Sequence, residues 1–189
     1  MQHDNPLELS VIVPVLNEAA ELPALFETLS AQQSVRFELI LCDGGSGDGT
    51  PELAANMAPK LPFPLRGTIT PRGRGRQMNA GAALAAGEWL LFLHADSRFP
   101  DRTALYRATS TFREQLTRSP RQVAGRFALR FRRSDTSPSL AYFFYEAKAR
   151  LNRADCIRGD QGFLISGKFF QQLGGFDTSL PFYEDVRLV

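Results

Sequence analysis

Short apolar runs alternate with helix-like segments through the first half of the chain. Runs typical of strands lie at residues 9–15, 37–42, 65–70 and 89–93. Helical patterns follow the first three runs, at residues 19–31, from Thr50 onward, and at residues 77–86, where Gly87 is expected to cap the helix. Strands that alternate with helices in this way form a mostly parallel sheet with right-handed crossovers. The sequence therefore predicts an α/β fold in which helices flank the sheet.

The chain is less regular after Pro100. Residues 103–116 have a helical pattern, and residues 125–132 alternate apolar with basic side chains, as a half-exposed strand does. Residues 139–151 carry apolar side chains at helical spacing with basic residues beside them. Such a segment is typical of a helix that packs on its own core, and it leaves peripheral contact with a membrane open.

Length and composition fit a single folded domain. The chain has 189 residues, of which 43% are hydrophobic, and this is enough for a sizeable core. No internal repeat, low-complexity tract or clear linker divides it. We expect one domain over residues 1–189, with a regular half at 1–98 and a less regular half at 99–189.

Charge and cysteine content limit the partners and the compartment. The formal net charge is only +2, so attraction of the whole molecule to nucleic acid is weak and any anion binding must be local. Cys42 and Cys156 do not make a disulfide framework, which favours a reducing compartment. The N-terminus lacks the pattern of a secretory signal, and no apolar run approaches the ~20 residues of a bilayer span. We expect a cytoplasmic protein with no nucleic-acid partner.

Polar side chains follow three of the predicted strands where each strand ends. Glu18 comes after the first strand, Asp43 ends the second, and His94 and Asp96 follow the fourth. The carboxyl ends of adjacent parallel strands meet in one crevice. We therefore expect these side chains to share a ligand site, where a cation would offset the cost of burying the Asp96 carboxylate.

Some of these residues also have structural interpretations. Asp43 could form a turn through its own side chain. Asp48 precedes a glycine and is expected to shape its loop rather than to bind a ligand. A lone histidine such as His94 is also compatible with a structural role.

A glycine-rich segment places arginines at positions 72, 74 and 76, just before the helical pattern at 77–86. Guanidinium groups and helix N-terminal amides both bind phosphate oxygens, so we expect a diphosphate clamp here. RNA-binding segments also interleave arginine with glycine, but they are usually longer and rich in aromatic residues. The segment does not match the Gly-x-x-x-x-Gly-Lys-Ser/Thr loop, which argues against a nucleoside triphosphatase.

Four motifs occur in a recognisable order along the chain. They are Val-Pro-Val-Leu-Asn-Glu at 13–18, Asp-Gly-Gly-Ser-Gly-Asp-Gly at 43–49, His-Ala-Asp-Ser at 94–97 and Tyr-Glu-Asp at 183–185. Together they resemble family 2 glycosyltransferases of the GT-A fold, and the resemblance spans nearly the whole chain. With Gly-Asp-Gln-Gly at 159–162, the chain is also similar to a subgroup that has the His-Ala-Asp-Ser and Gly-Asp-Gln-Gly segments.

The resemblance implies a role for several residues. In such enzymes the acid after the first strand and the aspartate after the second contact the nucleoside, which points to Glu18 and Asp43. Arginines before the following helix approach the diphosphate, which points to Arg72 or Arg76. The late Glu-Asp pair supplies the general base of inverting members, and Asp185 is the matching position.

The resemblance also implies a metal. The carboxylate motif after the fourth strand binds a divalent cation that bridges the diphosphate, and this role falls on Asp96. The family commonly has Asp-x-Asp there and two adjacent aspartates after the second strand, whereas this chain has His94 and Gly44. Imidazole ligates manganese more readily than magnesium, so a metal held by Asp96 and His94 is expected to be Mn²⁺ rather than Mg²⁺. The loss of a carboxylate also leaves open that the metal is weakly bound or is not required.

The activity implied by the resemblance is that of an inverting glycosyltransferase. It would move a sugar from a nucleotide-diphosphate sugar, with UDP as the expected nucleotide, to a hydroxyl acceptor that the sequence does not identify. Residues 1–98 would bind the donor and residues 99–189 would form the acceptor side. Family members usually continue further beyond the position of Asp185, so the acceptor side could be incomplete.

Two other functions stay open. The departures at residues 44 and 94 would also fit a catalytically inactive protein that still binds a nucleotide or a nucleotide sugar. A methyltransferase would use the glycine loop after Asp43 to bind S-adenosylmethionine, but that function leaves the three arginines and Asp185 unexplained.

Overall fold

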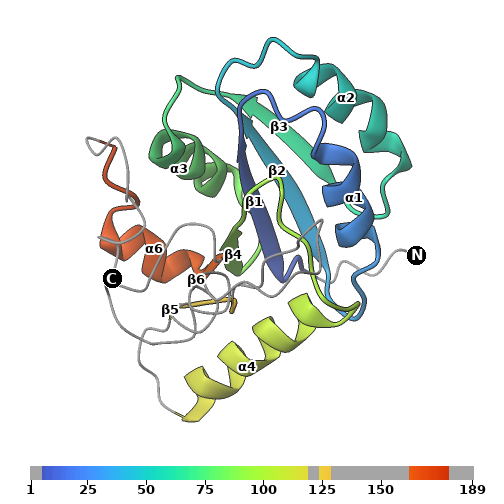
Figure 1. Cartoon of the computed structure of the whole chain (residues 1–189). Helices are drawn as coiled ribbons and strands as arrows, with labels where there is room; N and C mark the ends of the chain where they lie inside the picture. The colour runs from blue at the N-terminus through green and yellow to red at the C-terminus, as the bar shows by residue number, and fades with distance from the viewer. Residues whose placement is uncertain (1–5, 119–123, 129–161, 179–189) are drawn as a thin grey trace, which may run out of the picture.

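The computed structural model describes residues 6–118, 124–128 and 162–178 of the chain (Figure 1). The expected general base Asp185, the apolar and basic segment 139–151, and Cys156 all lie outside the described residues. Within these residues, no helix combines the length and the hydropathy that a membrane crossing requires.

Six strands of the described residues form one sheet in the order β3-β2-β1-β4-β6-β5. Its parallel part consists of β1 (Leu9–Val15), β2 (Phe37–Asp43), β3 (Leu65–Ile69) and β4 (Trp89–Phe92). Two short antiparallel strands extend it beyond β4, namely β6 (Phe163–Ser166) and then β5 (Ala124–Arg126). The predicted mostly parallel α/β sheet is confirmed.

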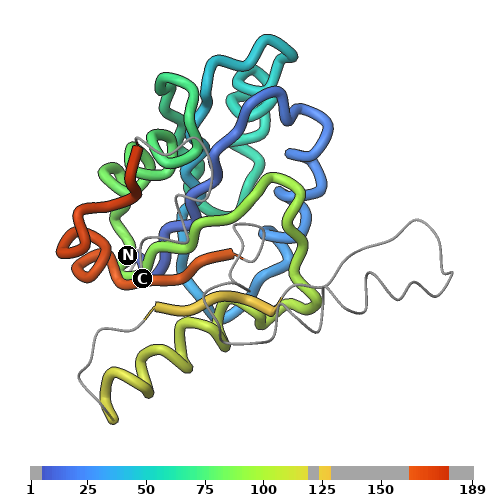
Figure 2. The backbone as a smooth tube through the Cα atoms, turned by 60° about the vertical axis from the view of Figure 1, so that its left-hand side comes forward, coloured from blue at the N-terminus to red at the C-terminus, as the bar shows by residue number. Residues whose placement is uncertain are grey.

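Helices cover both faces of the sheet, as Figures 1 and 2 show from two directions. One face packs against α1 (Leu22–Ser30), α2 (Thr50–Met57) with the short helix η1 (Ala58–Lys60), and α4 (Ala104–Arg118). The other face packs against α3 (Arg74–Leu84) and α6 (Gly167–Leu173). The described part of the chain is therefore a three-layer α/β/α arrangement.

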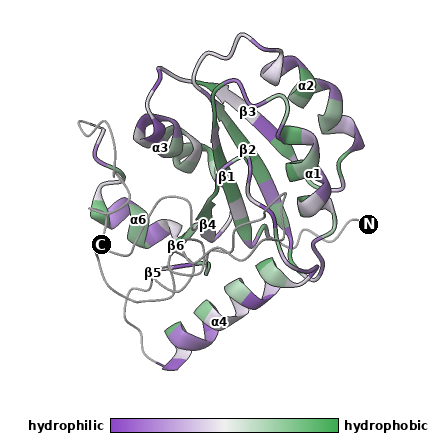
Figure 3. Ribbon diagram, in the orientation of Figure 1, coloured by the Kyte–Doolittle hydropathy of each residue, from purple (hydrophilic) through white to green (hydrophobic). Residues whose placement is uncertain are grey.

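The central strands are buried on both faces, which explains why they read as continuous apolar runs. In β1, Val11 and Val13 belong to the core beneath α1, whereas Ile12 belongs to the core beneath α3. In β4, Leu91 belongs to the core beneath α1 and Leu90 to the core beneath α3. Figure 3 shows β1 and β2 as mostly apolar ribbons between the two helical layers.

Two helices begin at residues other than those the sequence predicts. α1 begins at Leu22 rather than at residue 19, because Pro23 is accommodated within its first turn. α3 begins at Arg74, so part of the arginine and glycine segment lies in the helix and not in a loop before it. Gly73 precedes this helix with a φ of 136°, a backbone conformation that favours glycine.

Gly87 was expected to cap α3, and this expectation is wrong. The helix ends at Leu84 with Ala85 as its C-cap residue. Gly87 instead lies directly against β1, since a Cβ at this position would be 2.5 Å from the carbonyl carbon of Leu9 and 2.6 Å from the nitrogen of Ser10. Only glycine leaves room for this contact between two main chains.

A buried carboxylate holds the same contact together. Glu38 is only 1% exposed, and its Oε1 accepts hydrogen bonds from Ser10 Oγ and from the Ala86 main-chain nitrogen, both at 2.7 Å. The Gly87 nitrogen donates to Ser10 Oγ at 2.9 Å, and Arg66 pairs with Glu38 Oε2 at 3.3 Å. These bonds join the segment after α3 to β1 and β2, and no local sequence pattern predicts them.

Replacing Gly87 with alanine is expected to destabilise the fold, because the added Cβ meets main-chain atoms that cannot rotate away. The free energy of unfolding, measured by urea denaturation, should fall by about 3 kcal/mol. Gly67→Ala in the edge strand β3 is a matched control, since no atom lies within 4 Å of its added Cβ. Its stability should not fall by more than about 0.5 kcal/mol. Equal stability of the two variants would contradict the close contact.

Candidate functional site

A cavity of about 520 Å³ opens at the carboxyl ends of β1 and β4. Its walls come from the loop after β1, the segment after β4 and the first turn of α3. Its charged and polar lining residues include Glu18, Glu21, Arg74, Gln77, His94 and Asp96. Three residues that the sequence assigns to a common site, Glu18, His94 and Asp96, thus share one crevice.

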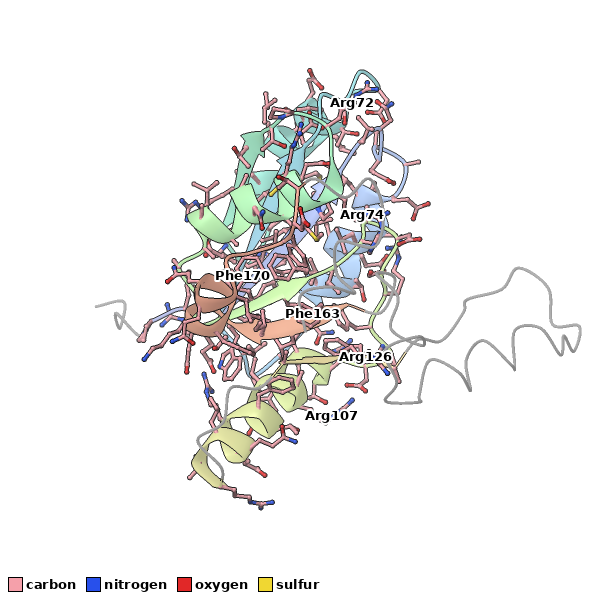
Figure 4. The ribbon with its side chains drawn as sticks, turned by 90° about the vertical axis from the view of Figure 1, so that its left-hand side faces the viewer. Arg72, Arg74, Arg107, Arg126, Phe163 and Phe170 are labelled. Carbon is pink, nitrogen blue, oxygen red and sulfur yellow. The ribbon has the colours of Figure 1, made fainter. Side chains whose placement is uncertain are left out.

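The other expected site residues lie beside this crevice or outside the described chain. Asp43 ends β2 and is 7% exposed. Arg72 and Arg76 flank the crevice residue Arg74 but do not line the cavity themselves. Figure 4 shows Arg72 at the top of the molecule and Arg74 below it, in the same upper half. Asp185 cannot be placed relative to the crevice, because it lies outside the described residues.

Arg74 belongs to the predicted diphosphate clamp, although the family resemblance pointed to Arg72 or Arg76. As the first residue of α3, it lies three positions before Gln77, and residues three apart share one face of a helix. Both line the cavity, whereas Arg76 lies on a different face and its stem runs close to Gly73. The arginine is visible in the sequence, but whether its side chain faces the cavity depends on the residue at which α3 begins.

The crevice is crowded with negative charge. Burial raises the pKa of the Glu18 carboxyl above its ordinary value, and the neighbouring carboxylates of Asp96, Glu21 and Asp48 raise it further. A raised pKa means that the ionised carboxylate is less favourable in the crevice than it is in water. A cation between these carboxylates would relieve that repulsion.

The loops after β1 and β2 are joined by hydrogen bonds between main chain and side chains. The Asn17 nitrogen donates to Ser46 Oγ at 2.8 Å, and the Gly47 nitrogen donates to Asn17 Oδ1 at 2.9 Å. The Glu18 nitrogen donates to Thr50 Oγ1 at 2.9 Å. Asn17 adopts a φ of 58°, which asparagine tolerates better than most residues. The two loops therefore form one unit that fixes the backbone of Glu18.

Both aspartates of the second loop shape its backbone. Asp43 Oδ2 accepts hydrogen bonds from the nitrogens of Gly45 at 2.8 Å and Ser46 at 3.0 Å, which is the turn geometry that its sequence context allowed. Asp48 accepts from the nitrogens of Ala19 and Thr50, both at 3.0 Å. The expected loop-shaping role of Asp48 is confirmed, and a contact of Asp43 with a nucleoside stays a prediction.

Arg98 ties the segment that carries His94 and Asp96 to the start of α1. Its guanidinium donates to the carbonyls of Ala95 at 3.0 Å and Ser97 at 2.9 Å, and to Glu21 Oε2 at 2.8 Å. Its side chain is 21% exposed, so the ion pair is partly shielded from water. Arg98 thereby holds one wall of the crevice against another, and the sequence analysis did not identify it.

The donor atoms at the crevice suit a cation that shares its ligands with phosphate. Among the described residues, no three or more His, Cys, Asp or Glu side chains gather closely enough to hold a metal. The Asp96 carboxylate with neighbouring Glu18 is a hard oxygen set, and His94 lines the same cavity. Hard divalent ions are often held by one or two carboxylates together with substrate phosphates.

A second cavity, of about 530 Å³, lies at the opposite end of the sheet. Its charged residues pair with one another, since Arg113 lies 2.7 Å from Glu8 and 3.8 Å from Glu88. None of the sequence motifs ends there. The crevice at the carboxyl ends of the strands is therefore the candidate functional site.

Replacing Asp48 with asparagine is expected to lower stability at neutral pH. The hydrogen bond from the Thr50 hydroxyl, followed by those from the main-chain nitrogens of Ala19 and Thr50, lowers the pKa of Asp48 below its ordinary 3.8. A lowered folded-state pKa stabilises the fold above the ordinary pKa, and this contribution is lost as the pH falls through the lowered value. The stability difference from wild type should therefore shrink below pH 3.8, as urea denaturation at a series of pH values would show.

Glu27→Gln is the matched control for this experiment, because Glu27 is an exposed carboxylate on α1. It should show little change at neutral pH. A stability difference for Asp48→Asn that stays constant across the acid range would contradict the role of the charged carboxylate.

Comparison with known proteins identifies the family. The family model described as glycosyl transferase family 2 matches residues 10–171. A PGL/p-HBAD biosynthesis glycosyltransferase of Mycobacterium tuberculosis is 42% identical over 102 residues, which are 53% of this chain and 40% of the relative. An undecaprenyl-phosphate 4-deoxy-4-formamido-L-arabinose transferase of Aeromonas hydrophila is 38% identical over 97 residues, which are 49% of this chain and 30% of the relative. The chain matches less than half the length of either relative.

Solved structures share the fold. A mannosyltransferase from Pyrobaculum calidifontis in complex with GDP-Man and Mn²⁺ superimposes with a TM-score of 0.72 at 22% identity, over 97% of this chain and 51% of that one. S. aureus TarS 1-349 in complex with UDP superimposes with a TM-score of 0.74 at 18% identity, over 96% of this chain and 54% of that one. These likenesses show the GT-A fold. Since the family match runs from β1 into α6, the protein belongs to glycosyl transferase family 2.

Proposed function

We propose that the protein transfers a sugar from a nucleotide-diphosphate sugar, with UDP as the nucleotide, to a hydroxyl acceptor with inversion at the anomeric carbon. The observation that carries the proposal is the crevice at the carboxyl ends of β1 and β4, where Glu18 and Asp96 lie in one cavity with Arg74. Proteins of the same fold are described in complex with UDP, UDP-GlcNAc or GDP-Man, which supports a nucleotide-sugar donor.

The diphosphate would bind at the first turn of α3. Arg74 stands at the first residue of this eleven-residue helix and lines the crevice. Main-chain N–H groups at a helix N-terminus and a guanidinium both favour phosphate oxygens. Arg72 and Arg76 add positive charge on either side. Glu18 and Asp43 would contact the nucleoside from the two joined loops.

Asp96, with His94, would hold a divalent cation, Mn²⁺ rather than Mg²⁺ because of the imidazole. When bound, such a cation neutralises the negative charge that grows on the departing diphosphate. Burial is the largest cause of the raised pKa of Glu18 and the charge of Asp96 is the next, so a cation beside these two carboxylates would offset both effects.

Asp185 would act as the general base. Its carboxylate takes the proton of the acceptor hydroxyl as the hydroxyl oxygen bonds to the anomeric carbon. The bond from that carbon to the diphosphate oxygen breaks, and its electron pair leaves with the nucleoside diphosphate. Attack from the face opposite the leaving group inverts the anomeric carbon.

The proposal is tested with a panel of nucleotide sugars and Mn²⁺, by measuring release of the nucleoside diphosphate and its binding by calorimetry. Asp185→Asn should lower kcat by about 10²-fold to 10⁴-fold and leave UDP binding unchanged. Asp96→Asn should weaken Mn²⁺-dependent UDP binding. Asp101→Asn is the control, since Asp101 pairs with Arg107 at the exposed start of α4.

The outcomes separate the alternatives. Full activity of Asp185→Asn would remove it as the general base. Tight nucleotide binding by wild type with no turnover would favour the catalytically inactive binding protein. Absence of any nucleotide binding by wild type would overturn the proposed function.

Arg98→Gln is expected to weaken Mn²⁺-dependent UDP binding about tenfold, or about 1.4 kcal/mol, because it releases the segment that carries Asp96. Calorimetry measures the change. Arg107→Gln is the matched control, since it breaks an ion pair of 2.7 Å with Asp101 away from the crevice. Equal UDP affinity of Arg98→Gln and wild type would show that the tie does not position the site.

A further inference from the structure

Gln77 is a polar residue in the crevice to which the proposed mechanism gives no role. Its side chain is 5% exposed, and the residue lines the cavity from the first turn of α3. Its Nε2 donates to the carbonyl oxygen of Val15 at 2.9 Å and to that of Cys42 at 2.7 Å. Both amide hydrogens are therefore committed to main-chain acceptors at the ends of β1 and β2. This pairing fixes which way the amide group points.

Within the part of the chain that the structure describes, the amide oxygen of Gln77 accepts no hydrogen bond. Among the described residues, Trp89 Nε1 is the only side-chain nitrogen or oxygen that is both fully buried and without a partner. Gln77 Oε1 does not belong to that fully buried and unpartnered class, and the residue lines the crevice. A nearly buried acceptor without a partner is costly unless a ligand supplies the donor.

The position of Gln77 is coupled to the absence of a side chain at Gly44. A Cβ at Gly44 would lie 3.2 Å from Gln77 Nε2 and 3.3 Å from both Cδ and Oε1. The amide of Gln77 thus fills the space beside residue 44.

We propose that Gln77 is a neutral hydrogen-bond acceptor for the nucleoside of the donor. The inference rests on the proposed function, because it assigns a residue to the same nucleotide crevice. Its oxygen would accept from an uncharged O–H or N–H donor, either a ribose hydroxyl or the N3–H of the base. A diphosphate offers no such donor when it is ionised, so Gln77 would contribute selectivity for the nucleoside.

A neutral acceptor has a physical advantage at this place. Glu18, Glu21 and Asp96 already line the crevice, and a further carboxylate would repel both them and the diphosphate. An amide oxygen accepts the same hydrogen bond without adding charge. The two main-chain carbonyls prevent the amide from turning its donor side toward the ligand.

The test is calorimetric titration of UDP in the presence of Mn²⁺ into wild type, Gln77→Ala and Gln77→Met. We expect both variants to bind UDP about fivefold to tenfold more weakly. The KM for the donor should rise while kcat changes little. Gln77→Met keeps the volume of the side chain, so it serves if the alanine variant does not fold.

Analogues of UDP identify the group that is bound. Wild type should lose affinity for one of 2′-deoxy-UDP, 3′-deoxy-UDP or N3-methyl-UDP, and the Gln77 variants should bind that analogue and UDP equally. The analogue that shows this behaviour distinguishes ribose from base. Equal losses for every ligand would instead indicate a structural role and overturn the proposal.

Two further variants separate recognition from support of the fold. Gln32→Ala is the matched control, because Gln32 Nε2 also bonds a distant main-chain carbonyl, that of Asp101 at 2.8 Å, but outside the crevice. It should leave UDP affinity unchanged. The double variant Gly44→Asp/Gln77→Ala should regain UDP affinity, since it returns an acceptor to the vacated space. Gly44→Asp alone should not gain affinity, because its side chain crowds the Gln77 amide.

The failure of this inference is distinct from that of the proposed function. If wild type binds UDP and Gln77→Ala binds it as tightly, the role of Gln77 is overturned and the proposed function stands. If wild type binds no nucleotide with Mn²⁺, both are overturned.

Discussion

The parallel pairing of β1 with both β2 and β4 decides where the candidate site residues lie. β1 runs between its neighbours with Val15 opposite Asp43 and Ile12 opposite Phe92. Because the carboxyl ends of these parallel strands lie at the same end of the sheet, the residues that follow them meet there. The pairing is held by burial of both faces, and a slip of one residue would exchange the side chains that face the two helical layers. The core thus fixes the site before any ligand binds.

The crevice is built by placing like charges together and holding them with bonds that do not depend on a ligand. Glu18 lies near Asp96, and burial together with nearby carboxylates raises its pKa. Its main-chain nitrogen is nevertheless held by a hydrogen bond to Thr50 Oγ1, within the two joined loops. Arg98 holds the segment of Asp96 in the same manner. These bonds hold the main chain on both sides of the crevice without using the carboxylates of Glu18 and Asp96. A site of this kind favours a cation and, through Arg74, an anion beside it.

The sequence predicted the sheet and the common crevice because both leave local patterns. Strands that are buried on both faces are apolar throughout, and polar residues mark the points where they end. The remaining features depend on partners that are far away in the sequence. Gln77 bonds Val15, which is 62 positions away, and Arg98 bonds Glu21, which is 77 positions away. The direction of Arg74 likewise depends on the residue at which α3 begins, and boundaries of helices are weakly encoded by local sequence.

The two departures of this chain from the common family pattern both remove a negative charge. Gly44 stands in place of an aspartate, and the amide of Gln77 fills the neighbouring space. His94 stands in place of a second aspartate beside Asp96. Each change removes one negative charge from the end of the sheet where burial and neighbouring carboxylates already raise the pKa of Glu18. The crevice would then attract a cation less strongly than a site with aspartates at all four of positions 43, 44, 94 and 96. It would also repel a diphosphate less strongly. The balance between metal and arginine in holding the diphosphate would shift toward Arg74.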